Sequence, residues 1–241
     1  GELVRVLRRA AMPIQAWSIC IQGDLLAAAG SDRTIHVWNW QRGESLRNLS
    51  MPGQVDTVAF SPDGRLLAGA GEGSEVHIWD NRTGDLLHKR RVAAVRTLAL
   101  AFDAAGETLA TGGEDNRIQL WTVADMSLRG VLAGHGNWIL SLVFSPNGTQ
   151  LATSSADQTA RLWDTKNSKL LRVFAGHGGW VRTVAYTPDG LGLVTGSDDH
   201  TIRLWDVRTG ELQHSLQGTM RWVDLIQFSP DGRMVMSAGI G

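Results

Sequence analysis

The sequence is poor in several features, and each shortage excludes a class of protein. Among 241 residues there is a single cysteine, Cys20, so no disulfide can form within the chain. A chain without a disulfide is typical of a reducing compartment, and we therefore expect a cytoplasmic location. Apolar runs are only a few residues long, whereas a membrane helix needs about 20 residues, so we expect no membrane partner.

An excess of charge of one sign is also missing. The chain has 23 basic and 24 acidic residues, which gives a formal net charge of −1. Proteins that attract nucleic acid or anionic membranes without specificity carry a basic excess, so we expect no nucleic-acid partner. Hydrophobic residues make up 43% of the chain and charged residues 20%, which is typical of a soluble globular protein with a sizeable core.

Tyrosine and phenylalanine are scarce, and tryptophan takes their place. The chain has one Tyr and five Phe against ten Trp, which indicates that one Trp-containing unit is used repeatedly. Five tryptophans are separated by 41, 42, 42 and 42 residues, namely Trp38, Trp79, Trp121, Trp163 and Trp205. A second aromatic series has a constant step of 42 residues, namely Phe60, Phe102, Phe144, Tyr186 and Phe228. Two independent landmarks with one period indicate an array of similar units.

Each unit has the pattern of four short β-strands. Runs such as VDTVAF at 55–60 are rich in β-branched and aromatic residues, and Ser-Pro-Asp-Gly at 61–64 then makes a tight turn. The third run of each unit ends at the repeated Trp, and no helical periodicity is present. A single four-stranded sheet cannot bury both faces, so we predict an all-β fold in which antiparallel sheets stack radially as the blades of a β-propeller.

We predict one domain over residues 1–241, with split terminal blades. Residues 1–9 are predicted to form the outer strand of a preceding blade, and 218–241 to form an incomplete last repeat. The five nearly complete repeats between them are 10–50, 51–91, 92–133, 134–175 and 176–217. Unpaired strand edges are an aggregation liability, so we expect a segment of a longer propeller with seven or more blades. A six-bladed ring in which both ends share one blade is the alternative.

The ends of the third strands resemble a known family. Trp-Asp pairs occur at 79–80, 163–164 and 205–206, and Gly-His pairs at 134–135 and 176–177 place each His 28 residues before a Trp. In this combination the chain resembles the WD-repeat β-propeller family over essentially its whole length. Its regular, Ala/Gly/Arg-rich repeats are similar to those of bacterial members.

The resemblance implies a buried, hydrogen-bonded tetrad in the two most regular units. Its members are His135, Thr153, Asp157 and Trp163 in one unit, and His177, Thr195, Asp199 and Trp205 in the next. The chemistry is suitable, because Asp accepts from His, His bonds the hydroxyl, and the hydroxyl accepts from the indole N–H. The same residue types form hydrolase triads, but a set that repeats in adjacent units and is buried against Trp indicates a structural role. The tetrad is incomplete elsewhere, with Gly69 and Ala28 at the Thr position of the units that end at Trp79 and Trp38.

A further tryptophan series stands six residues before the second aromatic landmark. It comprises Trp138, Trp180 and Trp222, with Trp17 an approximate match and Arg96 at the same position of another unit. The resemblance implies that these residues lie near one rim of the central channel. Trp and Arg are enriched in binding hot spots, so we expect contact with a partner. The alternative is that these tryptophans only pack between blades.

We find no catalytic, metal-binding or cofactor-binding constellation in the sequence. We therefore predict a non-catalytic protein–protein interaction scaffold or sensor that binds a protein or peptide partner, or other domains of the same parent protein. The resemblance to bacterial members implies a larger signalling protein with a nucleotide-switch ATPase, kinase or protease-like domain. Two alternatives are a propeller enzyme with its active site at the channel mouth and a nucleic-acid-binding propeller.

Overall fold

The computed structural model describes residues 16–92, 96–217, 222–228 and 234–239. These residues form antiparallel β-sheets and contain no helix. Five sheets have four strands each, and a sixth sheet is a two-stranded hairpin. The predicted all-β fold of four-stranded antiparallel blades is confirmed. The outer strand predicted at 1–9 lies outside the described residues.

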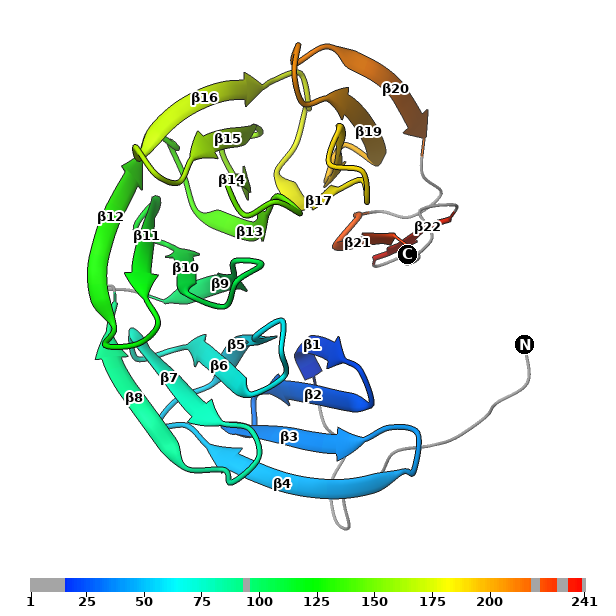
Figure 1. The fold of residues 1–241 in the computed structure, drawn as a ribbon. Coiled ribbons are helices and arrows are strands. Elements are labelled where there is room, and N and C mark those ends of the chain that lie inside the picture. Colours follow the sequence, from blue (N-terminus) through cyan, green and yellow to red (C-terminus); the bar gives the residue numbers. More distant parts are fainter. Residues whose placement is uncertain (1–15, 93–95, 218–221, 229–233, 240–241) are drawn as a thin grey trace.

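Within each four-stranded sheet the strands pair in chain order, and the first strand is innermost (Figure 1). Blade 1 contains β1 (Ala16–Gln22), β2 (Leu25–Gly30), β3 (Thr34–Asn39) and β4 (Glu44–Ser50). Blade 2 contains β5 (Val55–Phe60), β6 (Leu66–Gly71), β7 (Glu75–Asp80) and β8 (Leu86–Arg91). Blade 3 contains β9 (Thr97–Phe102), β10 (Thr108–Gly113), β11 (Arg117–Thr122) and β12 (Ser127–Ala133).

The remaining sheets continue the same order along the chain. Blade 4 contains β13 (Ile139–Phe144), β14 (Gln150–Ser155), β15 (Ala160–Asp164) and β16 (Lys169–Phe174). Blade 5 contains β17 (Val181–Tyr186), β18 (Gly192–Ser197), β19 (Thr201–Asp206) and β20 (Leu212–Gln217). The terminal hairpin contains β21 (Leu225–Phe228) and β22 (Val235–Ala238).

The Ser-Pro-Asp-Gly turns close the first hairpin of a blade. In blade 2 the Ser61 hydroxyl donates to Asp63 over 2.6 Å and accepts from the Leu66 amide over 2.9 Å. Gly64 has a φ of 70°, which a residue with a Cβ adopts only at a cost. The turn therefore fixes the register in which β5 meets β6.

The core lies between neighbouring blades. Trp163 is 1% exposed and packs with Ile118, Leu120 and Leu132 of the preceding blade. The same arrangement recurs at three other blade interfaces, through Trp79, Trp121 and Trp205. The third and fourth strands shift register immediately before each repeated Trp. Each of blades 2 to 5 thus buries its own indole against its predecessor, as expected for a linear array with nearest-neighbour interfaces.

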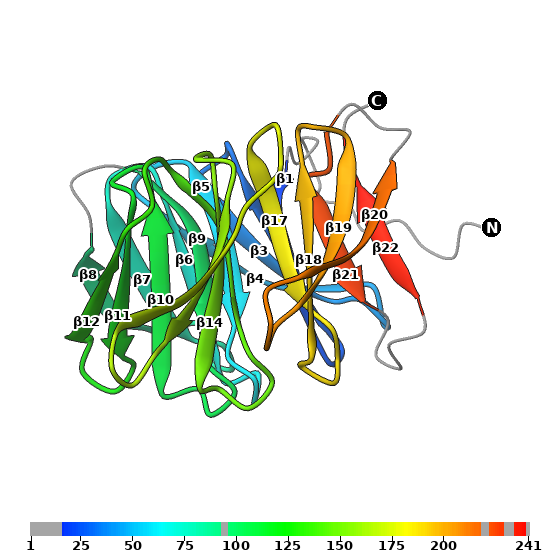
Figure 2. The same cartoon turned by 90° about the horizontal axis from the view of Figure 1, so that it is seen from above.

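The blades stand around a central opening (Figure 1). Within the described residues, the first and last sheets are not hydrogen-bonded to each other. Seen from the side, the strand ends form two rims (Figure 2). We call the rim where the first strand of each blade begins the entry rim; it includes Val55, Thr97, Ile139 and Val181.

Candidate functional site

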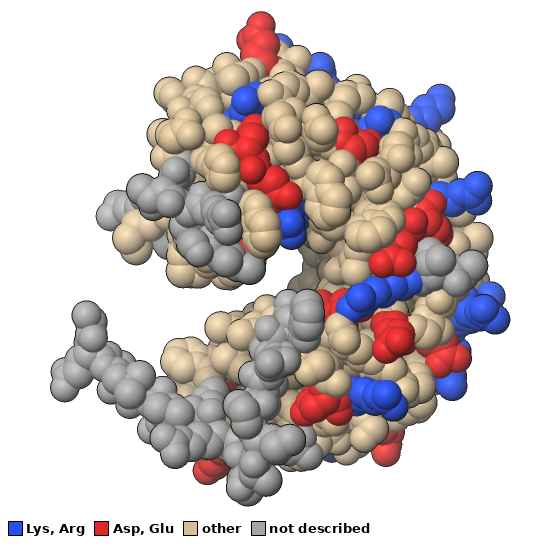
Figure 3. Space-filling model, turned by 180° about the vertical axis from the view of Figure 1, so that it is seen from behind, with Lys and Arg blue, Asp and Glu red and all other residues tan. Residues whose placement is uncertain are grey.

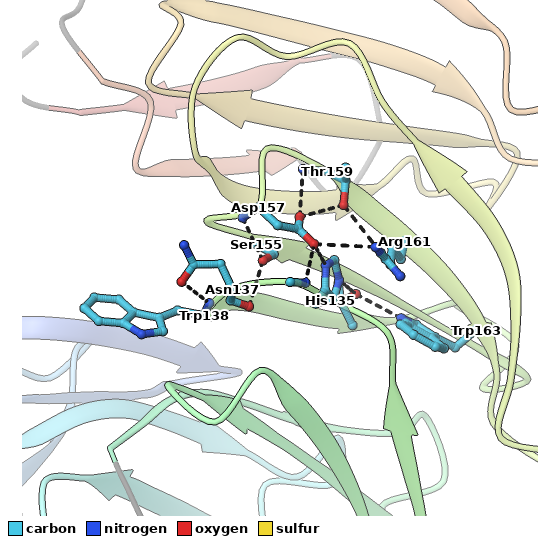
Figure 4. Close-up of polar contacts among 10 residues, drawn as sticks. His135, Asn137, Trp138, Ser155, Asp157, Thr159, Arg161 and Trp163 are labelled. Atoms are coloured by element: carbon cyan, nitrogen blue, oxygen red, sulfur yellow. Dashed lines mark hydrogen bonds and ion pairs between the residues drawn. The ribbon is translucent and has the colours of Figure 1, made fainter.

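Blade 4 brings together His135, Thr153, Asp157 and Trp163 (Figure 4). The indole N–H of Trp163 donates to the Thr153 hydroxyl over 2.9 Å. That hydroxyl lies 2.7 Å from His135 Nε2, and His135 Nδ1 lies 2.7 Å from an Asp157 carboxylate oxygen. Because a carboxylate only accepts, Nδ1 carries the proton and Nε2 accepts from the hydroxyl. The four groups thus form one continuous chain of donors and acceptors.

Blade 5 repeats this arrangement with His177, Thr195, Asp199 and Trp205. The three distances are 2.8 Å from Nδ1 to the carboxylate, 2.7 Å from Nε2 to the hydroxyl, and 2.9 Å from the indole nitrogen to the hydroxyl. Both threonines are fully buried. The amide of Gly178 also donates to the Asp199 carboxylate over 2.9 Å, which ties the turn between β18 and β19 to the loop that enters the blade.

Burial and hydrogen bonding set the protonation states of the tetrads. Desolvation holds the pKa of His135 and of His177 below the usual value, so both imidazoles are neutral at pH 7. Burial alone raises the pKa of Asp157, but hydrogen bonds from His135, Thr159 and the Gly136 amide outweigh it and hold that pKa well below its usual range. The buried hydroxyls lie against indoles, and this arrangement favours a structural role over a nucleophilic one.

In the blades with incomplete tetrads, different groups lie where the complete tetrads have their hydroxyl and imidazole. In blade 3 the indole of Trp121 still donates to Thr111 over 3.1 Å. In blade 2 a Cβ at Gly69 would overlap the Cδ1 atom of Ile35, so a side chain of blade 1 occupies the place of the hydroxyl. In blade 1 the buried indole nitrogen of Trp38 has no hydrogen-bond partner among the described residues.

Blade 1 holds a second imidazole arrangement that sequence reasoning missed. His36 is 1% exposed, and its ring nitrogens lie 2.6 Å from Asn48 Oδ1 and 2.7 Å from Asp32 Oδ2. Its ring lies 5.6 Å from that of Trp38. The imidazole therefore comes from the third strand instead of the entry loop. Its place two residues before the repeated Trp was the signal that the sequence offered.

The tryptophans at the entry rim form what we call the indole arc, namely Trp138, Trp180 and Trp222. The rings of Trp138 and Trp180 lie 6.0 Å apart at 60°, and these side chains are 39% and 38% exposed. The Trp138 amide donates to Asn137 Oδ1 over 2.8 Å, and its carbonyl accepts from the Ala156 amide over 3.0 Å (Figure 4). The backbone below the exposed indole is therefore held on both sides.

Arg182 joins the indole arc, although the sequence analysis did not single it out. Its guanidinium lies 5.6 Å from the ring centre of Trp180 and 5.0 Å from that of Trp222. It also pairs with Asp198 and lies 3.4 Å from Asp224. Stacking between two indoles is a cation–π arrangement. The position of Arg182 two residues after Trp180 gave no hint of it, because Trp222 belongs to the next repeat.

The two other residues expected at this rim are Arg96 and Trp17. Arg96 forms hydrogen bonds through two guanidinium nitrogens to Asp56 of the preceding blade. The carboxylates of Asp56, Glu114 and Glu72 raise the pKa of Arg96, with the Asp56 hydrogen bonds first. Trp17 belongs to β1, but its side chain lies outside the described residues.

Neither a reactive cysteine nor a metal-binding cluster is found among the described residues. Burial raises the pKa of Cys20 to about 12, so its thiol is protonated and a poor nucleophile at pH 7. Among the described residues, no group of three or more His, Cys, Asp or Glu could hold a metal ion. That part of the chain also contains no helix long and apolar enough to cross a membrane.

Two family models match the chain. The model for the WD domain, G-beta repeat, matches residues 88–122, 126–164 and 168–206. The model for the anaphase-promoting complex subunit 4 WD40 domain matches residues 15–97. The chain contains WD40 repeats. WD40 repeats are typical of protein-interaction scaffolds, and two of the matched repeats end one residue after Trp163 and Trp205 of the complete tetrads.

One curated relative is similar over a short stretch. It is the eukaryotic translation initiation factor 3 subunit I of Debaryomyces hansenii, 45% identical over 51 residues. The alignment covers 20% of this chain and 15% of the relative. The chain therefore spans only a small part of that protein, and the similarity concerns about one WD40 repeat.

Proposed function

We propose that this chain is a non-catalytic scaffold or sensor, and that the indole arc of its entry rim contacts a protein or peptide partner. WD40 repeats support the general role of a protein-interaction scaffold. The observation that carries the choice of surface is the pair of adjacent, half-exposed indoles at Trp138 and Trp180. Large aromatic side chains held on a rigid backbone are the usual anchors of protein interfaces.

Two further observations bear on the alternatives. An enzyme at the channel mouth would use accessible acid–base groups, whereas the His–Thr–Asp sets are buried and occur in two neighbouring blades. A nucleic-acid-binding propeller would present a basic groove, whereas Arg96 and Arg182 are paired with carboxylates. Both observations favour a scaffold.

The surface is tested by capture of partners from extracts of the source cell. We expect Trp138→Ala and Trp180→Ala together to reduce capture by at least about tenfold, because hot-spot truncation costs more than 1 kcal/mol. Trp40→Ala is the matched control, since Trp40 is 41% exposed and its indole donates to Gly23 at the other rim. The thermal midpoint of each variant is measured in parallel. Unchanged capture by a folded double variant would remove the indole arc from the proposal.

We also propose that the scaffold works within a larger signalling or regulatory protein. This idea rests on the resemblance of the repeats, and its bacterial context stays a prediction, since the relative reported above is a eukaryotic factor. The denatured mass of the protein isolated from its source tests it. A mass well above the 26.2 kDa of this chain is expected, and a mass equal to it would contradict the idea.

A further inference from the structure

Equivalent positions of the entry rim differ in charge from blade to blade. We call the residue directly before the first strand of a blade its entry residue. The backbone N–H of the first residue in the turn after the second strand donates to the carbonyl of that entry residue. This bond links Glu72 to Gln54, Glu114 to Arg96, Ala156 to Trp138, and Asp198 to Trp180. The repeat therefore places one variable side chain beside each entry residue. Beside Trp138 that side chain is an uncharged Ala, and in the two adjoining blades it is a carboxylate.

At three equivalent positions of this rim, carboxylates outnumber cations. Two residues after the entry position stand Asp56 in blade 2, Arg182 in blade 5 and Asp224 in the terminal hairpin. Together with the entry and turn positions, these sites give five carboxylates and two guanidinium groups from blade 2 to the hairpin: Asp56, Glu72, Glu114, Asp198 and Asp224 against Arg96 and Arg182. Figure 3, which views this rim, shows acidic groups on both sides of the central opening. These positions thus have an excess of carboxylates, some of them on the blades that present the indole arc.

Both cations at these positions are already engaged. Arg96 is bound by Asp56, and Arg182 is bound by Asp198 and stacked between Trp180 and Trp222. The Arg182 stack shows that two indoles at the spacing of neighbouring blades accept a guanidinium between them. The Trp138 and Trp180 rings instead pack directly on each other, 6.0 Å apart at 60°, so a further cation would bind the exposed part of the Trp138 indole and not the space between the two rings. Within the described residues no cation lies over the Trp138 ring.

We propose that the partner presents a basic segment to the entry rim, with an arginine or lysine side chain against the Trp138 indole and a further cation beside Glu114. The proposal rests on the proposed function and names the chemistry of its partner. An exposed indole attracts a cation through its ring face. The surrounding carboxylates add electrostatic complementarity, which raises the association rate and disfavours acidic partners.

The test selects peptides on the chain itself. A random peptide library displayed on phage is selected on the immobilised 241-residue chain, and the enriched peptides are synthesised. We expect Arg and Lys to be enriched at least about threefold over the unselected library, and affinity to fall as salt rises. Trp138→Ala should weaken binding of these peptides by about tenfold, as expected for loss of a hot spot.

Two charge variants test whether a carboxylate of the entry rim contributes to binding of the basic peptides. Glu114→Gln should weaken the selected peptides about threefold by removing one facing carboxylate. Glu107→Gln, in the turn before β10 at the other rim, is the matched control and should have no effect. Thermal midpoints of all variants are measured, so that unfolding is not mistaken for lost binding.

The remaining outcomes distinguish the two proposals. Neutral or acidic peptides that depend on Trp138 would overturn the basic segment while leaving the indole arc as the binding surface. Selected peptides that bind the wild type, Trp138→Ala and Trp180→Ala equally well would overturn both proposals. No enrichment of any peptide over an empty support would overturn the basic segment as well.

Discussion

At the scale of single residues, the threonine hydroxyl is the central group of each complete tetrad. Thr153 accepts from Trp163 and donates to His135, so its hydroxyl serves two buried partners. Thr111 of blade 3 accepts from Trp121 in the same way, without a described histidine beside it. The two positions share a fold environment and differ in the number of groups that depend on the hydroxyl.

Thr153→Val should therefore destabilise the chain more than Thr111→Val. The first change leaves an indole N–H and an imidazole without a partner, and each such group costs about 1–3 kcal/mol. The second change leaves only the Trp121 indole N–H, so its expected cost is about 1–3 kcal/mol in total. Urea unfolding followed by tryptophan fluorescence measures both free energies. An equal cost for the two substitutions would show that His135 gains nothing from the hydroxyl.

Acid should weaken the tetrads in two stages. The folded pKa of His135 and of His177 lies below the ordinary value of 6.5, so the unfolded chain binds more protons there and stability falls as pH drops below about 6.5. The folded pKa of Asp157 and of Asp199 is also depressed, and their contribution is lost only as pH falls below about 4. Urea midpoints at pH 7.5 and 5 should differ, and the double variant His135→Gln, His177→Gln should reduce that difference. An undiminished difference would assign the first stage to other groups.

At the scale of elements, the second strand of blade 2 shows how one blade adapts to its neighbour. Gly69 lies on β6, where blades 4 and 5 have Thr153 and Thr195. The Ile35 side chain of blade 1 fills the vacated space, and its Cδ1 atom leaves no room for a Cβ at Gly69. The loss of a tetrad hydroxyl is thus coupled to a larger apolar group in the preceding blade.

Gly69→Ala should be destabilising, and Ile35→Val should relieve it. Overpacking a closely fitted core costs about 1–3 kcal/mol, and removal of the Cδ1 atom clears the overlap. A double-mutant cycle on the free energy of unfolding measures the coupling. Additive effects of the two substitutions would mean that the blades move apart instead of clashing.

At the scale of the whole molecule, hydrogen bonding to the repeated Trp increases from blade 2 to blades 4 and 5. Blades 4 and 5 each have a complete tetrad, blade 3 keeps the Thr–Trp bond, and blade 2 has an apolar filling. In an array with nearest-neighbour interfaces, such differences produce local differences in stability. The described residues of the indole arc lie on blades 4 and 5 and at the start of the terminal hairpin, beside the most strongly bonded part.

Native-state hydrogen exchange should follow this order. We expect the amides of β14 and β18 to exchange more slowly than those of β6, because opening blade 4 or blade 5 breaks the buried tetrad as well as the sheet. Mass spectrometry of peptides from the three strands gives the comparison. Slower exchange in β6 than in β14 and β18 would contradict the idea that the tetrads make their blades the most rigid.

Much of this architecture was predictable because it depends on residues that are close in sequence. The period of about 42 residues, the Ser-Pro-Asp-Gly turns and the alternation of short apolar runs indicated four-stranded blades, and the structure confirms that fold class. The tetrad residues came from the family resemblance, and the structure places them within hydrogen-bonding distance in blades 4 and 5. The predicted role of the rim tryptophans in binding stays a prediction.

The sequence by itself thus determined the repeat, the strands and the turns, since backbone preferences and hairpin registers are local. Only the tertiary structure decided which side chains of different repeats meet. Arg182 stacks on Trp222 of the next repeat, Arg96 reaches Asp56 of the preceding one, and Ile35 fills the space beside Gly69. These pairs are about 30 to 40 residues apart in sequence, and their distances depend on how the blades pack around the central opening. The repeat period in the sequence does not specify how neighbouring blades are oriented. It therefore could not predict these contacts between side chains of different blades.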